Sequence, residues 1–267
     1  MSNAPVNDTI APSQSRVPVI VLVGILAGFL SGLFGVGGGI LIVPGLVLVA
    51  SMDQRMAHGT SLAAVLPIAA SSMVTYWAHD HIDWPVVLFL AIGAVGGAVL
   101  GTRLLQVLPH RTLGLAFAVL LLASAARLGV ADSGTGRNEL DVLMAVLLVG
   151  VGLLTGILAG LLGVGGGIIM VPAMMMLFGI PPVIAKGTSL GVIIPTSIMG
   201  TWRNRTKKNV DFRAAAIVGI AGVLAAIAGG TLSARMSDTL SNVLFAILLT
   251  VVAIRLLRQI RREDKQK

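Results

Sequence analysis

Two glycine clusters, each inside a long apolar run, are the part of the sequence best suited to bind a ligand. The pentapeptide GVGGG occupies residues 35–39 and returns at residues 163–167. Helix is expected to resume after each cluster, which leaves several backbone N–H groups without intrahelical partners. Those N–H groups and the helix dipole favour negative charge, and glycine lets the backbone approach a ligand closely. The predicted anion-binding glycines are Gly37, Gly38, Gly39, Gly165, Gly166 and Gly167.

Close helix packing is the alternative role for glycine in such a run, because small residues let helices touch. Gly28 and Gly32, and likewise Gly156 and Gly160, have the GxxxG spacing of packing glycines. We interpret these four as packing residues. Three consecutive glycines exceed what packing requires, so we interpret each cluster as a binding site.

The motif GTSL follows each glycine cluster and supplies hydroxyl groups. Its hydroxyl-bearing residues are Thr60, Ser61, Thr188 and Ser189. They could cap the helix that they begin, or they could face the anion, and the sequence favours neither alternative. His58 precedes one copy of the motif and Lys186 precedes the other. Lys186 could neutralise an anion, although a flanking cation that snorkels to the interface is the commoner role. Both residues are included in the predicted site.

These motifs belong to one unit that occurs twice. Residues 28–44 return as residues 156–172, at an offset of 128. The same offset, without a gap, pairs the two GTSL copies, Pro67 with Pro195, and Asp83 with Asp211. Two unrelated apolar segments would not repeat Pro, Asp and GTSL at one spacing, so the chain contains an internal duplication. Asp83 and Asp211 each precede an apolar run and are predicted to be helix N-caps.

The composition places both units in a membrane. Hydrophobic residues make up 56% of the 267 and charged residues 11%, whereas soluble domains are about 25% charged. Several uncharged runs reach the roughly 20 residues that cross a bilayer as helix. The net charge of +8 is concentrated in residues 203–213 and 255–267, beside apolar runs. That placement is typical of cytoplasmic membrane flanks, so a nucleic-acid partner is excluded.

Each unit is expected to begin with a broken helix. The first run, Val17–Ala50, would be about 50 Å long as one helix, and its central glycines weaken helix by about 1 kcal/mol each. We predict two helical segments that return the chain to the side of entry, followed by three spans. An odd number of crossings inverts the second unit. Inversion also places the basic clusters on one side of the membrane. Because loops rich in lysine and arginine prefer the cytoplasm, this side is predicted to be cytoplasmic.

The predicted fold is therefore an all-α integral membrane protein of two inverted repeats, each a broken glycine-rich helical hairpin plus three transmembrane helices. The expected divisions are a disordered tail at 1–16, repeats at 17–129 and 142–258, a linker at 130–141, and a basic cytoplasmic tail at 259–267. Both termini are predicted to be cytoplasmic.

The acidic residues all fall in tails, loops or span boundaries, so no carboxylate is expected within the membrane. The spans contain no acid–base pair, metal-ligand cluster or activated nucleophile, which disfavours an enzyme and predicts neither cofactor nor metal. The remaining alternatives are a carrier, an anion channel or uniporter, and a structural subunit. A structural subunit would not require two glycine sites, whereas a channel could use the same sites as a carrier. The carrier is our leading hypothesis, because inverted repeats with broken helices commonly place a transport site near the midplane.

The pattern GxxxGxxGVGGGxxxVP followed by GTSL, occurring twice, resembles the TauE/SafE sulfite exporter family, also called the toluene sulfonate uptake permease family. The resemblance covers the chain from Val17 to about Arg258. It implies a bacterial inner-membrane secondary transporter for a sulfur-containing anion such as sulfite, sulfoacetate, an organosulfonate or a sulfinate. The family's glycine motif corresponds to Gly35–Gly39 and Gly163–Gly167, and its Thr-Ser step to Thr60-Ser61 and Thr188-Ser189.

The expected partners are a small anionic substrate and the lipid bilayer. Coupling to a proton or a sodium ion, and pairing into a homodimer, are left open by the sequence. Substrate identity and the direction of transport do not follow from the resemblance, because members of the family differ in both.

Overall fold

A computed structural model describes residues 17–104, isolated positions between 115 and 126, residues 140–162 and residues 165–264. Every regular element in these ranges is a helix, which confirms the all-α prediction. The first half of the chain contains α1 (Val17–Phe34), α2 (Gly39–Val49), α3 (Gln54–Trp77) and α4 (Trp84–Leu104). The second half contains α6 (Val142–Leu162), α7 (Gly167–Phe178), α8 (Pro182–Thr206), α9 (Phe212–Arg235) and α10 (Asp238–Asp264).

Several of these helices are suited to cross a bilayer. Five segments have the necessary length and apolar character: Val17–Phe34, Gln54–Trp77, Val142–Gly160, Pro182–Thr206 and Phe212–Arg235. Large apolar side chains lie on the outside of the bundle, among them Leu224 and Val142, which are 78% and 77% exposed. Lipid is the solvent in which such a surface is favourable, whereas in water it would be a liability.

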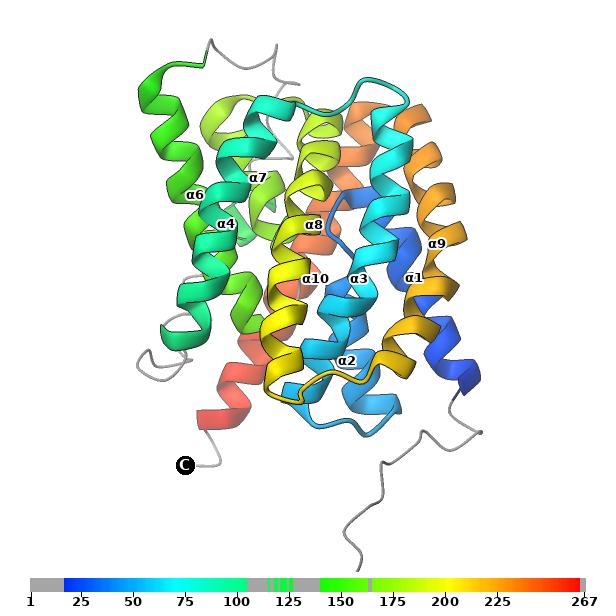
Figure 1. Cartoon of the computed structure of the whole chain (residues 1–267). Coiled ribbons are helices and arrows are strands. Elements are labelled where there is room, and N and C mark those ends of the chain that lie inside the picture. Colours follow the sequence, from blue (N-terminus) through cyan, green and yellow to red (C-terminus); the bar gives the residue numbers. More distant parts are fainter. Residues whose placement is uncertain are drawn as a thin grey trace, which may run out of the picture.

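Each repeat begins with a helix that is broken at its glycine cluster, as predicted. The helix that follows each break is short, since α2 has 11 residues and α7 has 12. At about 1.5 Å per residue, each is about 17 Å long and cannot cross a hydrocarbon layer of about 30 Å. Figure 1 shows α2 in the lower half of the bundle and α7 in the upper half. Each hairpin therefore combines a first arm that is long enough to cross the layer, α1 or α6, with a second arm that is not.

The two repeats exchange their first helices. Helix α1 of the first repeat packs along α9 of the second repeat, and α6 of the second repeat packs along α4 of the first. The approach is close: a Cβ atom built at Gly28 would lie 2.1 Å from the Gly222 carbonyl oxygen, and one at Gly156 would lie 2.1 Å from that of Ala94. These two contacts are related by the 128-residue offset. Reciprocal contacts of this kind are the signature of a two-fold relation between two similar units.

Corresponding helices run in opposite directions. The colours of Figure 1 show α3 rising from the lower end and α8 descending from the upper end. These directions agree with inverted repeats, while the orientation across a bilayer stays a prediction. The predicted tail at 1–16 and most of the linker at 130–141 lie outside the described residues. At the other end, α10 continues to Asp264, so helix extends into the segment predicted to be a basic tail.

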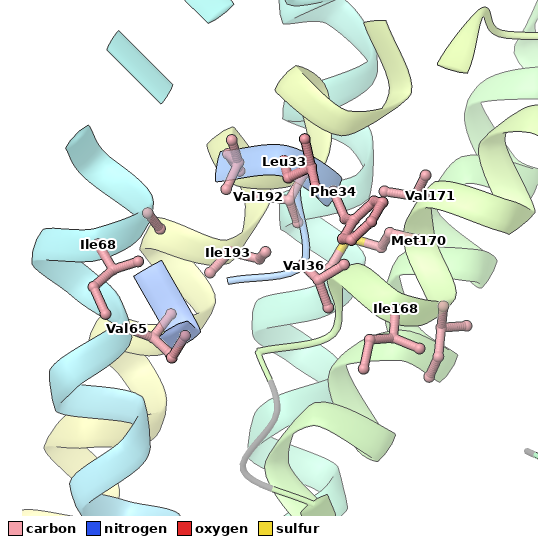
Figure 2. Close-up of a cluster of buried hydrophobic side chains, with 14 of the residues drawn as sticks. Leu33, Phe34, Val36, Val65, Ile68, Ile168, Met170, Val171, Val192 and Ile193 are labelled. Atoms are coloured by element: carbon pink, nitrogen blue, oxygen red, sulfur yellow. The ribbon is translucent and has the colours of Figure 1, made fainter. Parts of the chain in front are cut away.

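The centre of the bundle is apolar. Figure 2 shows side chains from α3, α7 and α8 gathered around the loop that leaves α1. Val65, Ile193 and Val36 are each at most 1% exposed. The helices α3 and α8 pass through this centre. Of the most apolar 18-residue stretch of each helix, 56% is buried in α3 and 67% in α8. These two helices position the candidate site.

Candidate functional site

The glycine clusters adopt backbone conformations that other residues rarely reach. Gly35, Gly37 and Gly38 have φ values of 68°, 79° and 73°. In the second repeat, Gly165 and Gly166 have values of 81° and 80°. Left-handed backbone at these positions ends the first helix and turns the chain into the second. Gly163 and Val164 lie outside the described residues.

Each short helix begins at the last glycine of its cluster. Gly38 is the N-cap of α2 and Gly166 is the N-cap of α7. Gly39 and Gly167 are therefore the first helical residues. The positive end of each helix dipole lies at this start and points into the buried centre of the bundle. The predicted helix start after each GVGGG is confirmed.

The two clusters meet at one place, around Val65 of α3 and Ile193 of α8. A Cβ atom built at Gly37 would lie 3.2 Å from Ile193 and 3.3 Å from Val65, and one at Gly165 would lie 3.6 and 3.7 Å from the same side chains. Val65 and Ile193 are themselves separated by 128 residues. The clusters therefore meet where equivalent residues of both repeats come together.

Direct backbone contact also joins the clusters. A Cβ atom at Gly167 would lie 2.6 Å from the Gly35 carbonyl oxygen and 2.8 Å from the Val36 Cα atom. Only glycine permits this approach. The structure thus brings together the predicted residues Gly37, Gly165 and Gly167 from opposite halves of the chain.

Lys186 of α8 lies next to the first glycine cluster and is buried, with 1% of its surface exposed. Its Nζ atom donates hydrogen bonds to the Ser241 Oγ atom and, at 3.4 Å, to the Ser233 Oγ atom. The ammonium group also lies 5.7 Å from the centre of the Phe34 ring, a favourable cation–π geometry. The interpretation of Lys186 as a snorkelling surface cation is therefore wrong.

The backbone at Lys186 is tied to the glycine cluster. A Cβ atom at Gly35 would lie 2.5 Å from the Lys186 carbonyl oxygen. The Ser189 Oγ atom lies 2.6 Å from both the Gly35 and the Lys186 carbonyl oxygens, within reach to donate to either. The backbone of the buried Lys186 and the buried Ser189 hydroxyl therefore adjoin the first break.

The two GTSL threonines connect the repeats. Thr188 Oγ1 accepts a hydrogen bond from the backbone N–H of Asp83 at 3.0 Å, and Thr60 Oγ1 accepts one from Asp211 at 2.9 Å. Capping of their own helices, one of the two alternatives for these hydroxyls, is wrong. The reason is that α3 begins at Gln54 and α8 at Pro182, more than a turn earlier.

The remaining predicted residues lie in the first repeat. Ser61 is fully buried in α3 and His58 is half-buried one turn nearer its start. The counterparts of Ser233 and Ser241 fall at positions 105 and 113, outside the described residues.

Several polar residues near Lys186 were missed by the sequence reasoning. Ser233 and Ser241 are 3% and 5% exposed. Asn242 follows at 6% exposure, and its Oδ1 atom has no hydrogen-bond partner among the described residues. No local motif marks these residues. The only available signal was their polarity near the ends of two apolar runs.

The acidic residues of the described ranges stand at helix boundaries and in turns. Asp211 caps α9 by accepting from the N–H groups of Arg213 and Ala214, and Asp83 accepts from Val86. The N-cap predictions are confirmed. Within the ranges listed above, no group of three or more His, Cys, Asp or Glu side chains could hold a metal ion.

Comparison with known proteins agrees with this architecture. The family model described as sulfite exporter TauE/SafE matches residues 5–142 and 147–267. A probable membrane transporter protein of Bacillus subtilis, YunE, is 27% identical over 88% of this chain and 94% of its own length. One from Xylella fastidiosa is 29% identical over 86% and 91%. MJ0441 of Methanocaldococcus jannaschii, also a probable membrane transporter protein, is 31% identical over 69% and 70%.

The helical bundle, with its duplicated broken helices, and these matches lead to one assignment. The chain is a multi-pass membrane transporter, not an enzyme, and it belongs to the TauE/SafE sulfite exporter family.

Proposed function

We propose that the chain is a secondary carrier that moves a small sulfur-containing anion across a bacterial inner membrane by alternating access. Sulfite, sulfoacetate, an organosulfonate and a sulfinate are the proposed substrates. The observation that carries the proposal is the meeting of both glycine clusters around Val65 and Ile193. A site built equally by two inverted units can be opened to either side when one unit rocks against the other.

The proposed substrate is an anion because positive potential surrounds this place. The N-terminal ends of α2 and α7 begin there, and each contributes about half a positive charge. The backbone of Lys186 packs against Gly35, and its buried ammonium group lies 5.7 Å from the centre of the Phe34 ring, at the end of α1. In the proposed complex, glycine N–H groups and the Ser189 hydroxyl bind the substrate oxygens. The proposal that the substrate contains sulfur is based on the family description, sulfite exporter.

The apolar side chains around the clusters suit the other part of such a substrate. Val65, Ile193 and Val36 line the meeting point (Figure 2). A two-carbon sulfonate would present a methylene chain to them and an oxyanion to the helix ends. Sites that combine apolar walls with a few polar groups are usual for small ligands.

The orientation that we propose places the lower end of the bundle in Figure 1 in the cytoplasm. Arg203 and Arg205 lie in the last turn of α8 at that end, and exposed Lys207 and Lys208 follow. The start of α1 and the end of α10 lie at the same end (Figure 1). Loops rich in lysine and arginine prefer the cytoplasm.

Transport by the purified protein in liposomes tests the proposal. A thermal-shift screen with sulfite, sulfoacetate, taurine, hypotaurine and thiosulfate selects the substrate, because selective binding raises the apparent unfolding temperature. We expect saturable counterflow of the selected anion. Conductive flux without exchange would overturn the carrier and support an anion channel.

The matched variants are Lys186→Met and Lys208→Met. Removing the buried charge should lower kcat/KM at least about tenfold, because a hydrogen bond to a charged group contributes about 1.5–3 kcal/mol. Lys208 is exposed, so its substitution should leave transport unchanged. Equal transport by a folded Lys186→Met protein would remove Lys186 from the proposed site.

A further inference from the structure

One face of α8 carries polar side chains on both sides of the glycine meeting point. Ser189, Ile193, Ser197 and Thr201 follow one another at intervals of four residues. Residues four apart in a helix lie on the same face. Ile193 contacts both glycine clusters, so this face, which we call the α8 ridge, passes through the proposed site.

The ridge differs on its two sides. Toward the start of α8, the Ser189 hydroxyl is hydrogen-bonded to backbone carbonyl oxygens. Toward the end of α8, the Ser197 Oγ and Thr201 Oγ1 atoms are buried and have no hydrogen-bond partner among the residues that the structure describes. Ser197 is completely buried.

A buried hydroxyl without a hydrogen-bond partner is energetically unfavourable and calls for an explanation. Other hydroxyls in α8 and α3 show that helix geometry does not force such a side chain to lack a partner. The adjacent Thr196 hydroxyl donates to the Val192 carbonyl oxygen at 2.8 Å, and Ser72 of α3 donates to that of Ile68 at 2.9 Å. A backbone partner is thus available to such side chains in these helices, whereas Ser197 and Thr201 do not use one.

The duplicated half of the chain lacks these hydroxyls. The residues that correspond to Ser197 and Thr201 on α3 are Ala69 and Met73. Ala69 is completely buried and Met73 packs against the apolar core. The fold therefore does not require polar side chains at these positions, and the polarity is specific to α8.

The polar side of the ridge leads to positive charge. Arg203 and Arg205 lie in the last turn of α8, two and four residues after Thr201. A charged end of this kind attracts anions and raises their local concentration. An anion that moves from the glycine clusters toward this end would meet the two hydroxyls first and then the arginines.

We propose that Ser197 and Thr201 line the anion path between the glycine clusters and the basic end of α8, and that their hydroxyl groups donate to the oxyanion in transit. This inference rests on the proposed function and adds a one-sided path to its shared central site. The path opens when the substrate is exposed at the basic end, whereas both hydroxyls are buried in the conformation described above.

The absence of cysteine from the sequence allows a direct test of access. Single cysteines replace Ser197, Thr201 and, as the matched control, Thr196. Membrane vesicles are treated with a membrane-impermeant anionic reagent, 2-sulfonatoethyl methanethiosulfonate, or with its cationic trimethylammonium analogue. The anionic reagent is itself an organosulfonate. Rates are normalised to those with free cysteine, and detergent gel filtration identifies folded variants.

We expect S197C and T201C to react with the anionic reagent at least about tenfold faster than T196C, since thiols buried in packed protein are inert. Normalised rates should be higher for the anion than for the cation, and higher when the basic end faces the added reagent. If one cysteine variant fails to fold, the other serves alone. Labelling of folded S197C and T201C no faster than T196C would overturn the path.

Transport separates this inference from the proposed function. S197A and T201V should slow counterflow of the selected anion, while T196V should not. Wild-type counterflow without labelling at Ser197 and Thr201 would overturn the path alone. Labelling at both positions without saturable counterflow would support the path and overturn the carrier.

Discussion

Thr60 Oγ1 accepts a hydrogen bond at 2.9 Å from the backbone N–H of Asp211, a residue in the other half of the chain. The reciprocal bond, from Asp83 to Thr188 Oγ1, has a length of 3.0 Å. Each threonine is completely buried. The two bonds therefore hold the start of α9 against α3 and the start of α4 against α8, and they join the repeats at opposite ends of the bundle.

Replacing either threonine by valine removes this bond with little change of shape. We expect T60V and T188V each to lower the free energy of unfolding by about 1 kcal/mol. Unfolding in mixed detergent micelles measures the change. T250V is the control, because the Thr250 hydroxyl donates to Ala246 within its own helix. Equal effects of all three substitutions would show that the bonds between repeats add nothing to stability.

Alanine at the two N-cap glycines should have unequal effects. Both positions have positive φ, which costs an L-residue about 1–2 kcal/mol. At Gly38 the new Cβ would also lie 2.7 Å from the Ala27 carbonyl oxygen, whereas at Gly166 it would meet the flexible end of Met170.

We therefore expect G38A to abolish transport and G166A to reduce it, as measured by counterflow in liposomes. G150A is the control, because no atom lies within 4 Å of the added Cβ there. A G38A protein that transports as well as G150A would argue against a functional role for the break.

The prediction that the GxxxG glycines serve helix packing can be tested at two equivalent positions, Gly32 and Gly160. A Cβ at Gly32 would lie 2.0 Å from the Ala226 carbonyl oxygen, whereas one at Gly160 would lie 3.5 Å from that of Ala98. We expect G32A to destabilise the protein by on the order of 1–3 kcal/mol through overpacking. G160A should be neutral or slightly stabilising, since alanine favours helix. The thermal unfolding temperature distinguishes the two, and equal shifts would contradict the observed contacts.

Tyr76 offers a further test of how α3 is held against α1. Its hydroxyl donates to the Gly32 carbonyl oxygen at 2.7 Å, and the side chain is fully buried. Y76F should reduce the free energy of unfolding by about 1 kcal/mol. S71A, which removes a hydroxyl bonded to Ile68 in the same helix, should cost less. A larger loss in S71A would show that the Tyr76 bond is dispensable.

The parts of the fold that depend on local chemistry were predictable from the sequence. Glycine clusters at 35–39 and 163–167 marked the helix breaks because a run of glycine cannot sustain helix. Asp83 and Asp211 marked helix starts because a carboxylate satisfies free N–H groups there. The 128-residue offset then related the two halves. Each of these signals operates within a few residues of the chain.

The surroundings of Lys186 were not predictable in this way. Its hydroxyl partners, Ser233 and Ser241, are 47 and 55 residues away in the chain. Only the tertiary fold, which places the end of α9 and the start of α10 within reach of the Lys186 side chain, brings them together. Composition suggested a surface cation because lysine in an apolar run normally reaches the interface. A buried lysine requires partners that single-sequence patterns do not reveal.

The exchange of first helices has a consequence for how the protein is made. The glycine-rich face of α1 packs on α9, so it has no place to pack until nearly all of the second repeat has been synthesised. At about 5–20 residues per second, α9 follows α1 out of the ribosome by roughly ten to forty seconds. During that interval the small-residue face of α1 must lie against lipid or against an assisting membrane protein.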